Sequence, residues 1–242
     1  MARLPRNFVP GLPQHVVQRG NNRQAIFVGD DDRYRYLDCL AEASSRHGCA
    51  IHAYVLMTNH VHLLLTPGQC DAVSRTMQSI GRRYVRYFNG RQARSGTLWQ
   101  GRFKAALVGS ERYFLTCMRY IELNPVRAAM TNRPEEYHWS SHRSNAFGAP
   151  CALLTEHDVY AKLGSNRRDC QSAYRALFSH AMADDELAAL RRATERGEPL
   201  GDETFIANAT KVLGRRVTKQ AHGGDRKSFD FMTHAASNTL TP

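Results

Sequence analysis

The sequence predicts an α+β fold, in which helices pack on an antiparallel sheet of the ferredoxin or RNA-recognition-motif type and a helical extension follows at the C-terminus. Three observations lead to this prediction. Over the first half of the 242 residues, runs with strand and helix character alternate in the order βαββαβ. A further amphipathic helical run comes next. Beyond residue 150, alanine, leucine and arginine at helical spacing replace the strand-forming residues.

Short apolar runs bounded by turn residues predict the four strands of the sheet. These strands are expected over residues 15–19, 51–56, 60–65 and 98–108. The second and third are joined only by the short segment 57–59, so they are expected to form a hairpin.

Two helices are predicted between these strands, over residues 30–46 and 71–88. The first begins with three aspartates, which favour a helix N-terminus, and Gly48 is suited to end it. The second is expected to end at Asn89 and Gly90, a pair typical of turns.

A further helix is predicted from Ser110, a suitable N-cap residue, to the neighbourhood of Pro125. Pro125 has no N–H to donate to the carbonyl of Ile121, so the helix should bend or end there. Tyr120 and Asn124 stand one turn apart and share a direction. Taken alone, Tyr120 also fits a core-edge aromatic residue whose hydroxyl stays in water.

The chain is expected to have three parts. Residues 1–148 hold the sheet and its helices, residues 149–220 form the small helical extension, and residues 221–242 are expected to be disordered because they lack any apolar period. The helices of the extension are predicted over residues 155–163, 168–178, 184–193 and 202–213.

The charge of the chain favours a polyanionic partner. Lys and Arg number 33 against 22 acidic residues, which gives a net charge of +11 and a pI near 9.7. Residues 72–110 contain no Asp or Glu, so their arginines cannot form local salt bridges and are free for phosphate groups. The candidate nucleic-acid contacts are Arg19, Arg82, Arg83, Arg86, Trp99, Arg102 and Lys104. Aromatic residues interleaved with these arginines could stack on unpaired bases, but Tyr84, Phe88 and Phe103 fit a core position as well.

Other classes of protein are disfavoured. No apolar run approaches the roughly eighteen residues of a membrane span, and the N-terminus lacks the apolar segment of a secretory signal, so a cytoplasmic location is expected. The six cysteines show no Cys-x-x-Cys pair, which disfavours a zinc ribbon, and they are expected to be reduced. No phosphate-binding G-x-x-x-x-G-K-[ST] sequence is present, so no nucleotide cofactor is expected.

The pair His60 and His62 is the most informative feature of the chain. Side chains two apart on a strand project from the same face, where both imidazoles can reach one divalent ion. Short His-x-His patterns are also frequent by chance, so two surface or hydrogen-bonded histidines remain an alternative.

Several motifs in fixed order resemble the single-tyrosine HUH transposases, and among them the REP-associated tyrosine transposases. The motifs are HVVQRGNNR at residues 15–23, YVLMTNHVH at 54–62, LWQGRF at 98–103, RYIELNPVR at 119–127 and WSSH at 139–142. Each motif is weak alone, but their order is specific, and together they cover about residues 8–148.

The resemblance implies a DNA-cleaving and DNA-joining enzyme with its catalytic domain in residues 1–148. Tyr120 would be the nucleophile that forms a covalent 5′-phosphotyrosine, and a neighbouring cation, either the metal or Arg119 or Arg127, would help the phenol ionise. His60, His62 and Asn124 would hold Mg²⁺ or Mn²⁺. The resemblance also implies single-stranded hairpin DNA of the REP type as partner, and it favours a monomer over a dimer.

Alternatives remain open from the sequence. Glu122 and His52 are fallback metal ligands, although an ideal helix turns Glu122 away from Asn124. A regulator that binds DNA without cutting it, or a metal-dependent nuclease without a covalent intermediate, would keep many of the same residues. Arg215 and Arg216, with Lys219, fit either a solvated charged surface or a surface that grips a DNA hairpin.

Overall fold

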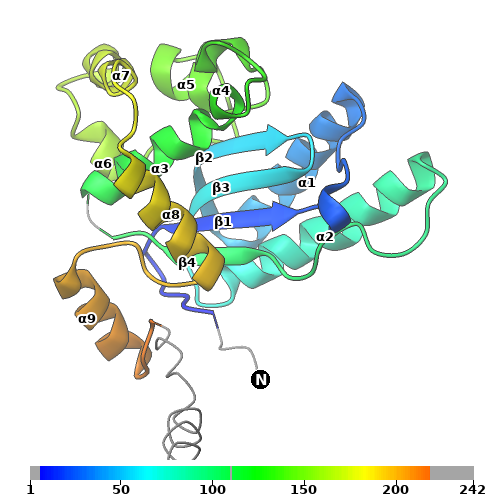
Figure 1. Ribbon diagram of the computed structural model, residues 1–242, viewed down its shortest axis with the longest axis horizontal. Helices are drawn as coiled ribbons and strands as arrows, with labels where there is room; N and C mark the ends of the chain where they lie inside the picture. Colours follow the sequence, from blue (N-terminus) through cyan, green and yellow to red (C-terminus); the bar gives the residue numbers. More distant parts are fainter. Residues whose placement is uncertain (1–5, 110, 219–242) are drawn as a thin grey trace, which may run out of the picture.

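The computed structural model describes residues 6–109 and 111–218, and they form the predicted α+β fold (Figure 1). Its strands are β1 (Gln14–Arg19), β2 (Cys49–Met57), β3 (His60–Pro67) and β4 (Lys104–Leu107). They make one sheet in the order β2-β3-β1-β4, and every neighbouring pair is antiparallel. This is the strand order of the ferredoxin-like topology, so the predicted architecture is confirmed.

The helices fall into a set that packs on the sheet and a set that follows it. The helices associated with the sheet are α1 (Asp30–His47), α2 (Ala72–Arg91), α3 (Glu111–Glu122), α4 (Asn124–Arg127) and α5 (His142–Phe147), with the short 3-10 helices η1 (Asn21–Arg23) and η2 (Pro134–Glu136). The later ones are α6 (Asp158–Ala161), α7 (Arg167–Ala176), α8 (Asp184–Arg196) and α9 (Glu203–Leu213).

The two faces of the sheet carry different partners. Helices α1 and α2 cover one face, while α3 and α8 lie over the other (Figure 1). Val61, Leu63 and Leu65 of β3 alternate with His60 and His62, so they point to opposite faces. The three aliphatic side chains are fully buried. The Tyr120 ring of α3 lies against the His62 ring, so the histidines lie on the face that α3 crosses.

Hydrogen bonds and a glycine explain where α1 begins and ends, and a close backbone contact explains the glycine that follows β1. The Asp32 carboxylate accepts hydrogen bonds from the backbone N–H groups of Val28 and Gly29, which satisfies donors at the helix N-terminus. Gly48 ends the helix at φ = 67°, as predicted. A Cβ atom at Gly20 would lie 2.4 Å from the carbonyl oxygen of Gln24, which explains the glycine that follows β1.

Two predicted boundaries were wrong. The fourth strand was expected over residues 98–108 but spans only Lys104–Leu107, because the preceding segment contacts β1 through a single bridge between Gly20 and Trp99 and turns at Gly101, where φ is 114°. Helix α2 continues through Asn89 and Gly90 to Arg91 instead of ending there. The buried Phe88 anchors its last turn, and its carbonyl accepts the N–H of Gln92.

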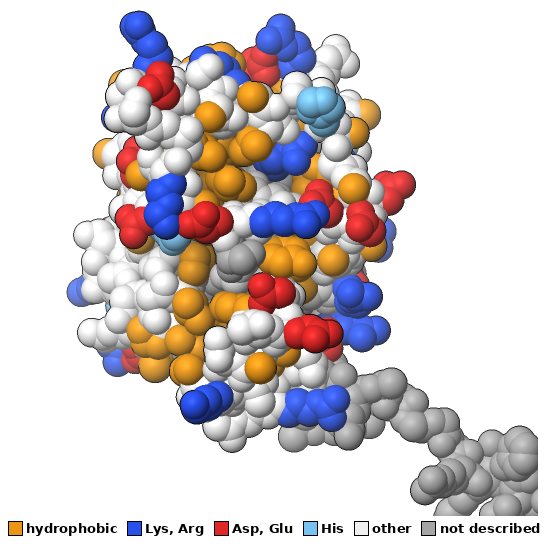
Figure 2. Space-filling model, turned by 90° about the vertical axis from the view of Figure 1, so that its left-hand side faces the viewer, with side chains coloured by type: hydrophobic (Ala, Val, Ile, Leu, Met, Phe, Trp, Pro, Cys, Tyr) orange, Lys and Arg blue, Asp and Glu red, His pale blue; other side chains and the backbone are white. Residues whose placement is uncertain are grey.

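The helical extension is present close to the predicted positions, and the short helix α5 was not predicted. Seen from the side on which α6, α7 and α9 lie, the surface carries basic, acidic and apolar side chains next to one another (Figure 2). Such a mixed surface does not form a basic stripe on this side. The tail predicted for residues 221–242 lies outside the described residues, as does Lys219.

None of the helices in the described ranges has the length and apolar character that crossing a lipid bilayer requires. All six cysteines lie within these ranges and are unpaired, as predicted.

Candidate functional site

The break between α3 and α4 places Tyr120 and Asn124 side by side. Helix α3 ends at Glu122, and α4 begins at Asn124 with Pro125 in its first turn, so the proline ends the helix where it was predicted to. The side-chain amide of Asn124 donates to the carbonyl of Tyr120 at 3.2 Å, and the Arg127 guanidinium donates to the same oxygen at 3.1 Å. Two side chains from α4 thus hold the backbone at Tyr120.

The structure brings the four predicted site residues together. The rings of His60 and His62 lie 5.0 Å apart between centroids, and the Tyr120 ring lies 5.7 Å from that of His62. The side chain of Asn124 lies within hydrogen-bonding reach of the His60 ring. Residues some sixty positions apart in the sequence therefore converge where α3 crosses β3.

Of the two arginines expected near the phenol, the structure selects Arg127. Its guanidinium carbon lies 4.1 Å from the centroid of the Tyr120 ring. Arg119 instead donates to the carbonyl of His180, on the other side of α3. A cation over the ring stabilises negative charge that develops on the phenol oxygen.

The hydrogen-bond network assigns the tautomer of His60. The side-chain nitrogen of Asn59 donates to the carbonyl of Arg23 at 2.9 Å, so the Asn59 oxygen is left as an acceptor. The Nδ1 atom of His60 lies 2.7 Å from this oxygen and must carry the proton. The Nε2 atom of a neutral His60 therefore bears a lone pair.

Sequence reasoning missed one member of the site, His15. Its ring lies on the same sheet face as His62, stacks against it at 5.1 Å, and has the Tyr120 ring at 5.8 Å. The signal was present in the chain, since His15 stands two residues before Val17, and Val17 pairs directly with His62. His15 could have been placed beside His62 only if the pairing of β1 with β3 were known, and the sequence does not reveal that pairing.

Burial keeps the histidines of this region neutral. Removal from water lowers the pKa of His15 to about 3 and that of His60 to about 4, and the positive charge of Arg127 or Arg19 adds to the effect. The pKa of His62 is lowered well below its usual value, mainly by burial. A neutral imidazole is the form that binds a metal ion.

These shifts predict that the fold is sensitive to acid. The unfolded chain binds protons on His15, His52 and His62 below about pH 6.5, whereas burial lowers all three pKa values in the folded state, to about 3 for His15 and about 4 for His52. The free energy of unfolding should therefore fall as pH drops from 6.5 toward 4, by up to about 1.4 kcal/mol per pH unit for each ring. Urea denaturation at several pH values measures this slope, and a flat profile would contradict it.

The donor set fits a divalent cation. Because the Asn124 amide nitrogen is engaged by the Tyr120 carbonyl, the side chain offers its oxygen. A neutral His62 whose Nδ1 is engaged by His15 offers Nε2, as His60 does. Two imidazole nitrogens and an amide oxygen are suitable ligands for a divalent metal with open positions. No group of three or more His, Cys, Asp or Glu side chains in the described ranges is arranged to hold a metal ion, and the set proposed here consists of two histidines and an asparagine.

The two fallback ligands are engaged elsewhere. His52 hydrogen bonds through both ring nitrogens, to the carbonyl of Thr155 at 2.7 Å and the hydroxyl of Thr66 at 2.8 Å. Glu122 is fully buried, and its carboxylate is hydrogen bonded to His142 of α5 and Tyr174 of α7. Neither side chain is directed at His60.

Glu122 instead forms the centre of a hydrogen-bond cluster, here called the Glu122 cluster. Its carboxylate accepts from four side chains, at 2.5 to 2.9 Å: Ser141, His142, Asn145 and Tyr174. This explains the motif at residues 139–142, because Ser141 and His142 fix α5 to the helix that bears Tyr120. The cluster ties α3, α5 and α7 together two residues after Tyr120.

The predicted nucleic-acid contacts fall on different parts of the surface. Arg19 of β1 lies directly opposite His60 of β3 in the strand register, so both side chains are on one face of the sheet. Lys104 is exposed on the same face. Arg82, Arg83 and Arg86 lie on α2, which covers the opposite face. Arg102 is exposed in the segment before β4, and the Trp99 indole is half-buried and stacked on Tyr84. Tyr84 and Phe88 are core residues, and Phe103 packs on Phe8.

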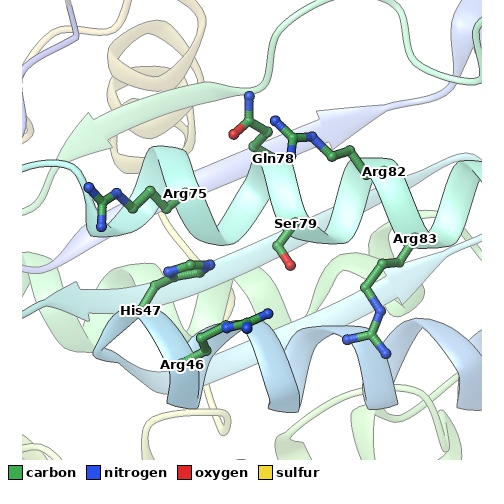
Figure 3. Close-up of a pocket in the computed structure, with 7 residues that line it drawn as sticks. All are labelled: Arg46, His47, Arg75, Gln78, Ser79, Arg82 and Arg83. Carbon is green, nitrogen blue, oxygen red and sulfur yellow. The ribbon is translucent and has the colours of Figure 1, made fainter.

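A basic pocket of about 390 Å³ lies between α1 and α2 (Figure 3). It is lined by Arg46, His47, Arg75, Gln78, Ser79, Arg82 and Arg83. The expectation that the arginines of residues 72–110 form no local salt bridges was wrong, because acidic residues just outside this interval lie within reach. Arg75 pairs with Asp71 just before it, and Arg83 pairs with Glu42 of α1.

Comparisons with known proteins bear on the family and the fold of this chain. Residues 8–124 match the family described as IS200-like transposases. The fold is similar to that of a REP-associated tyrosine transposase bound to a REP hairpin, with a TM-score of 0.52 and 20% identity over 65% of this chain and 93% of that one. A putative transposase from Deinococcus radiodurans R1 matches at 22% identity, over 57% of this chain and 98% of that one, with a TM-score of 0.34. Among curated proteins, no sequence matches.

The matched residues hold both histidines of the pair, the tyrosine and the asparagine of the site. Residues 8–124, just under half of the chain, thus match the IS200-like transposases, in agreement with the family that the ordered motifs predict.

Proposed function

We propose that this protein is a transposase that cleaves and joins single-stranded DNA at REP-type hairpins through a covalent 5′-phosphotyrosine on Tyr120. The observation that carries the proposal is the convergence of Tyr120 with His60, His62 and Asn124 at the crossing of α3 and β3. Attack on a phosphodiester needs a nucleophile and a group that neutralises the charge of the phosphate. The phenol can act as the nucleophile, and the neutral side chains beside it can bind a metal ion.

The chain supplies the nucleophile and its orientation. The Tyr120 oxygen forms a bond to phosphorus while the bond from phosphorus to the 3′ oxygen breaks, so the 3′ oxygen leaves and takes up a proton. Arg127, above the ring, stabilises charge on the phenol oxygen as its proton leaves. Reversal of this exchange with another 3′ hydroxyl joins strands. The bond energy is retained in the phosphotyrosine, so no nucleotide cofactor is required.

His60, His62 and Asn124 would hold the metal, Mg²⁺ or Mn²⁺. When bound, it would polarise the phosphate and neutralise charge in the transition state. Of the two ions, Mn²⁺ fits the two imidazole ligands better, since Mg²⁺ prefers oxygen ligands.

DNA is the proposed partner because phosphate-binding groups surround the site. Arg19 and Lys104 lie on the same sheet face as the histidines, where they can contact a strand that enters the site. The protein of similar fold is bound to a REP hairpin, which supports a hairpin here. Tyr120 lies beside His62 of the same chain, so one chain is sufficient for the proposed chemistry and a monomer is favoured.

The proposal is tested by incubating the full-length protein with single-stranded hairpin DNA, labelled at its 3′ end, and Mn²⁺. A labelled species that runs with the protein after denaturation is expected. Cleaved DNA without such an adduct would favour a metal-dependent nuclease, and binding without cleavage would favour a regulator. Either of these outcomes would contradict the covalent mechanism.

A further inference from the structure

A chain of buried hydrogen bonds connects the site to the C-terminal extension. The Nδ1 atom of His62 lies 2.8 Å from Nε2 of His15, and Nδ1 of His15 lies 2.8 Å from the hydroxyl oxygen of Thr194. The Thr194 hydroxyl lies 2.9 Å from the carbonyl oxygen of Leu190, one turn back in α8. His15, His62 and Thr194 are each at most 6% exposed.

The direction of this chain follows from counting protons. A carbonyl oxygen can only accept, so the Thr194 hydroxyl donates its one proton to Leu190 and is left as an acceptor. The Nδ1 atom of His15 must then be the donor to Thr194. A neutral His15 has no second proton, so its Nε2 accepts from Nδ1–H of His62. The proton of His62 is thereby placed on Nδ1, and its Nε2 keeps a lone pair.

We propose that Thr194 and His15 are positioning residues, which hold His62 in the tautomer whose Nε2 has a lone pair for the metal that His60 and Asn124 would also bind. The proposal rests on the proposed function for the role of His62 as a ligand. It assigns a task to the C-terminal extension, which the family match over residues 8–124 does not cover.

The position of α8 suits this task. The helix lies across β1 and β4 on the face that carries the histidines (Figure 1). Leu190 and Ala193 are buried against the sheet and fix the helix there. If the chain of hydrogen bonds ran in the reverse direction, His62 would carry its proton on Nε2, where it would block metal binding. The Leu190 carbonyl therefore decides which tautomer forms.

The test begins with the metal-free, full-length protein. Long-range ¹H–¹⁵N NMR spectra should show the proton of His62 on Nδ1 and a bare Nε2, and the same pattern for His15. A proton on Nε2 of His62 would overturn the proposal. This measurement needs neither DNA nor metal, so it stands or falls apart from the cleavage assay.

Two matched variants then test the link to the metal. Thr194→Val removes the hydroxyl and keeps the shape, whereas Thr194→Ser keeps the hydroxyl. Mn²⁺ binding measured by electron paramagnetic resonance should weaken roughly 10- to 100-fold in Thr194→Val and stay near wild type in Thr194→Ser. Equal Mn²⁺ affinity in wild type and Thr194→Val, or equal loss in both variants, would overturn the proposal. If Thr194→Val does not fold, the spectrum of the wild-type protein still decides. A confirmed tautomer with no DNA adduct would leave this inference standing and contradict the proposed function.

Discussion

Replacement of Tyr120 by phenylalanine is expected to abolish the covalent protein–DNA adduct and to slow strand cleavage by at least about 10³-fold. The change removes the only atom that the mechanism uses from this side chain. The ring contacts with His15, His62 and Arg127 do not depend on the hydroxyl, so the fold and DNA binding should persist. Adduct formation and hairpin binding are measured on the same preparation.

Tyr34→Phe is the matched control for this prediction. Tyr34 is 55% exposed and belongs to α1, which covers the opposite face of the sheet. Loss of its hydroxyl should change neither adduct formation nor hairpin binding. Cleavage at the wild-type rate in Tyr120→Phe would mean that another group, such as a metal-bound water, attacks the phosphate.

Substitution of Glu122 by alanine is expected to produce the largest loss of stability. Four donors of the Glu122 cluster would lose their acceptor inside the protein, and each buried unsatisfied group costs about 1 to 3 kcal/mol. Removal of the desolvated carboxylate offsets part of this cost, so a net loss of about 3 to 5 kcal/mol is expected. This corresponds to a fall in Tm of roughly 10 °C.

Glu111→Gln provides a control on the same helix. Glu111 is exposed and pairs with Lys162 at the surface, where an ion pair contributes at most about 1 kcal/mol. Thermal unfolding of both variants measures the contrast. Equal losses in the two would show that the Glu122 cluster does not fix α3.

Much of the fold was predictable because its signals are local. Apolar alternation identified the hairpin of β2 and β3, and Gly48 and Pro125 marked the ends of their helices. The fourth strand was predicted too long, because the apolar and aromatic residues near Trp99 pack against α2 rather than pair in the sheet. Propensity does not distinguish a paired segment from one that is buried without pairing.

The site was predictable only in part for a similar reason. His60, His62, Tyr120 and Asn124 belong to motifs and could be selected from the chain. His15 and Thr194 are 179 residues apart in the sequence, and nothing local connects them. Glu122 was considered as a ligand, but its actual partners lie on α5 and α7 and come together only in the folded chain. Residues that act through long-range contacts leave no periodic signal.

The central claim is that the Tyr120 phenol and the His60 and His62 imidazoles act on a single phosphate. The most direct test is a crystal structure of the Tyr120→Phe protein with hairpin DNA and Mn²⁺. The account predicts the ion bound to His60, His62 and Asn124, with the scissile phosphate between the ion and the ring at position 120. An ion held by other residues, or a phosphate bound away from that ring, would contradict it.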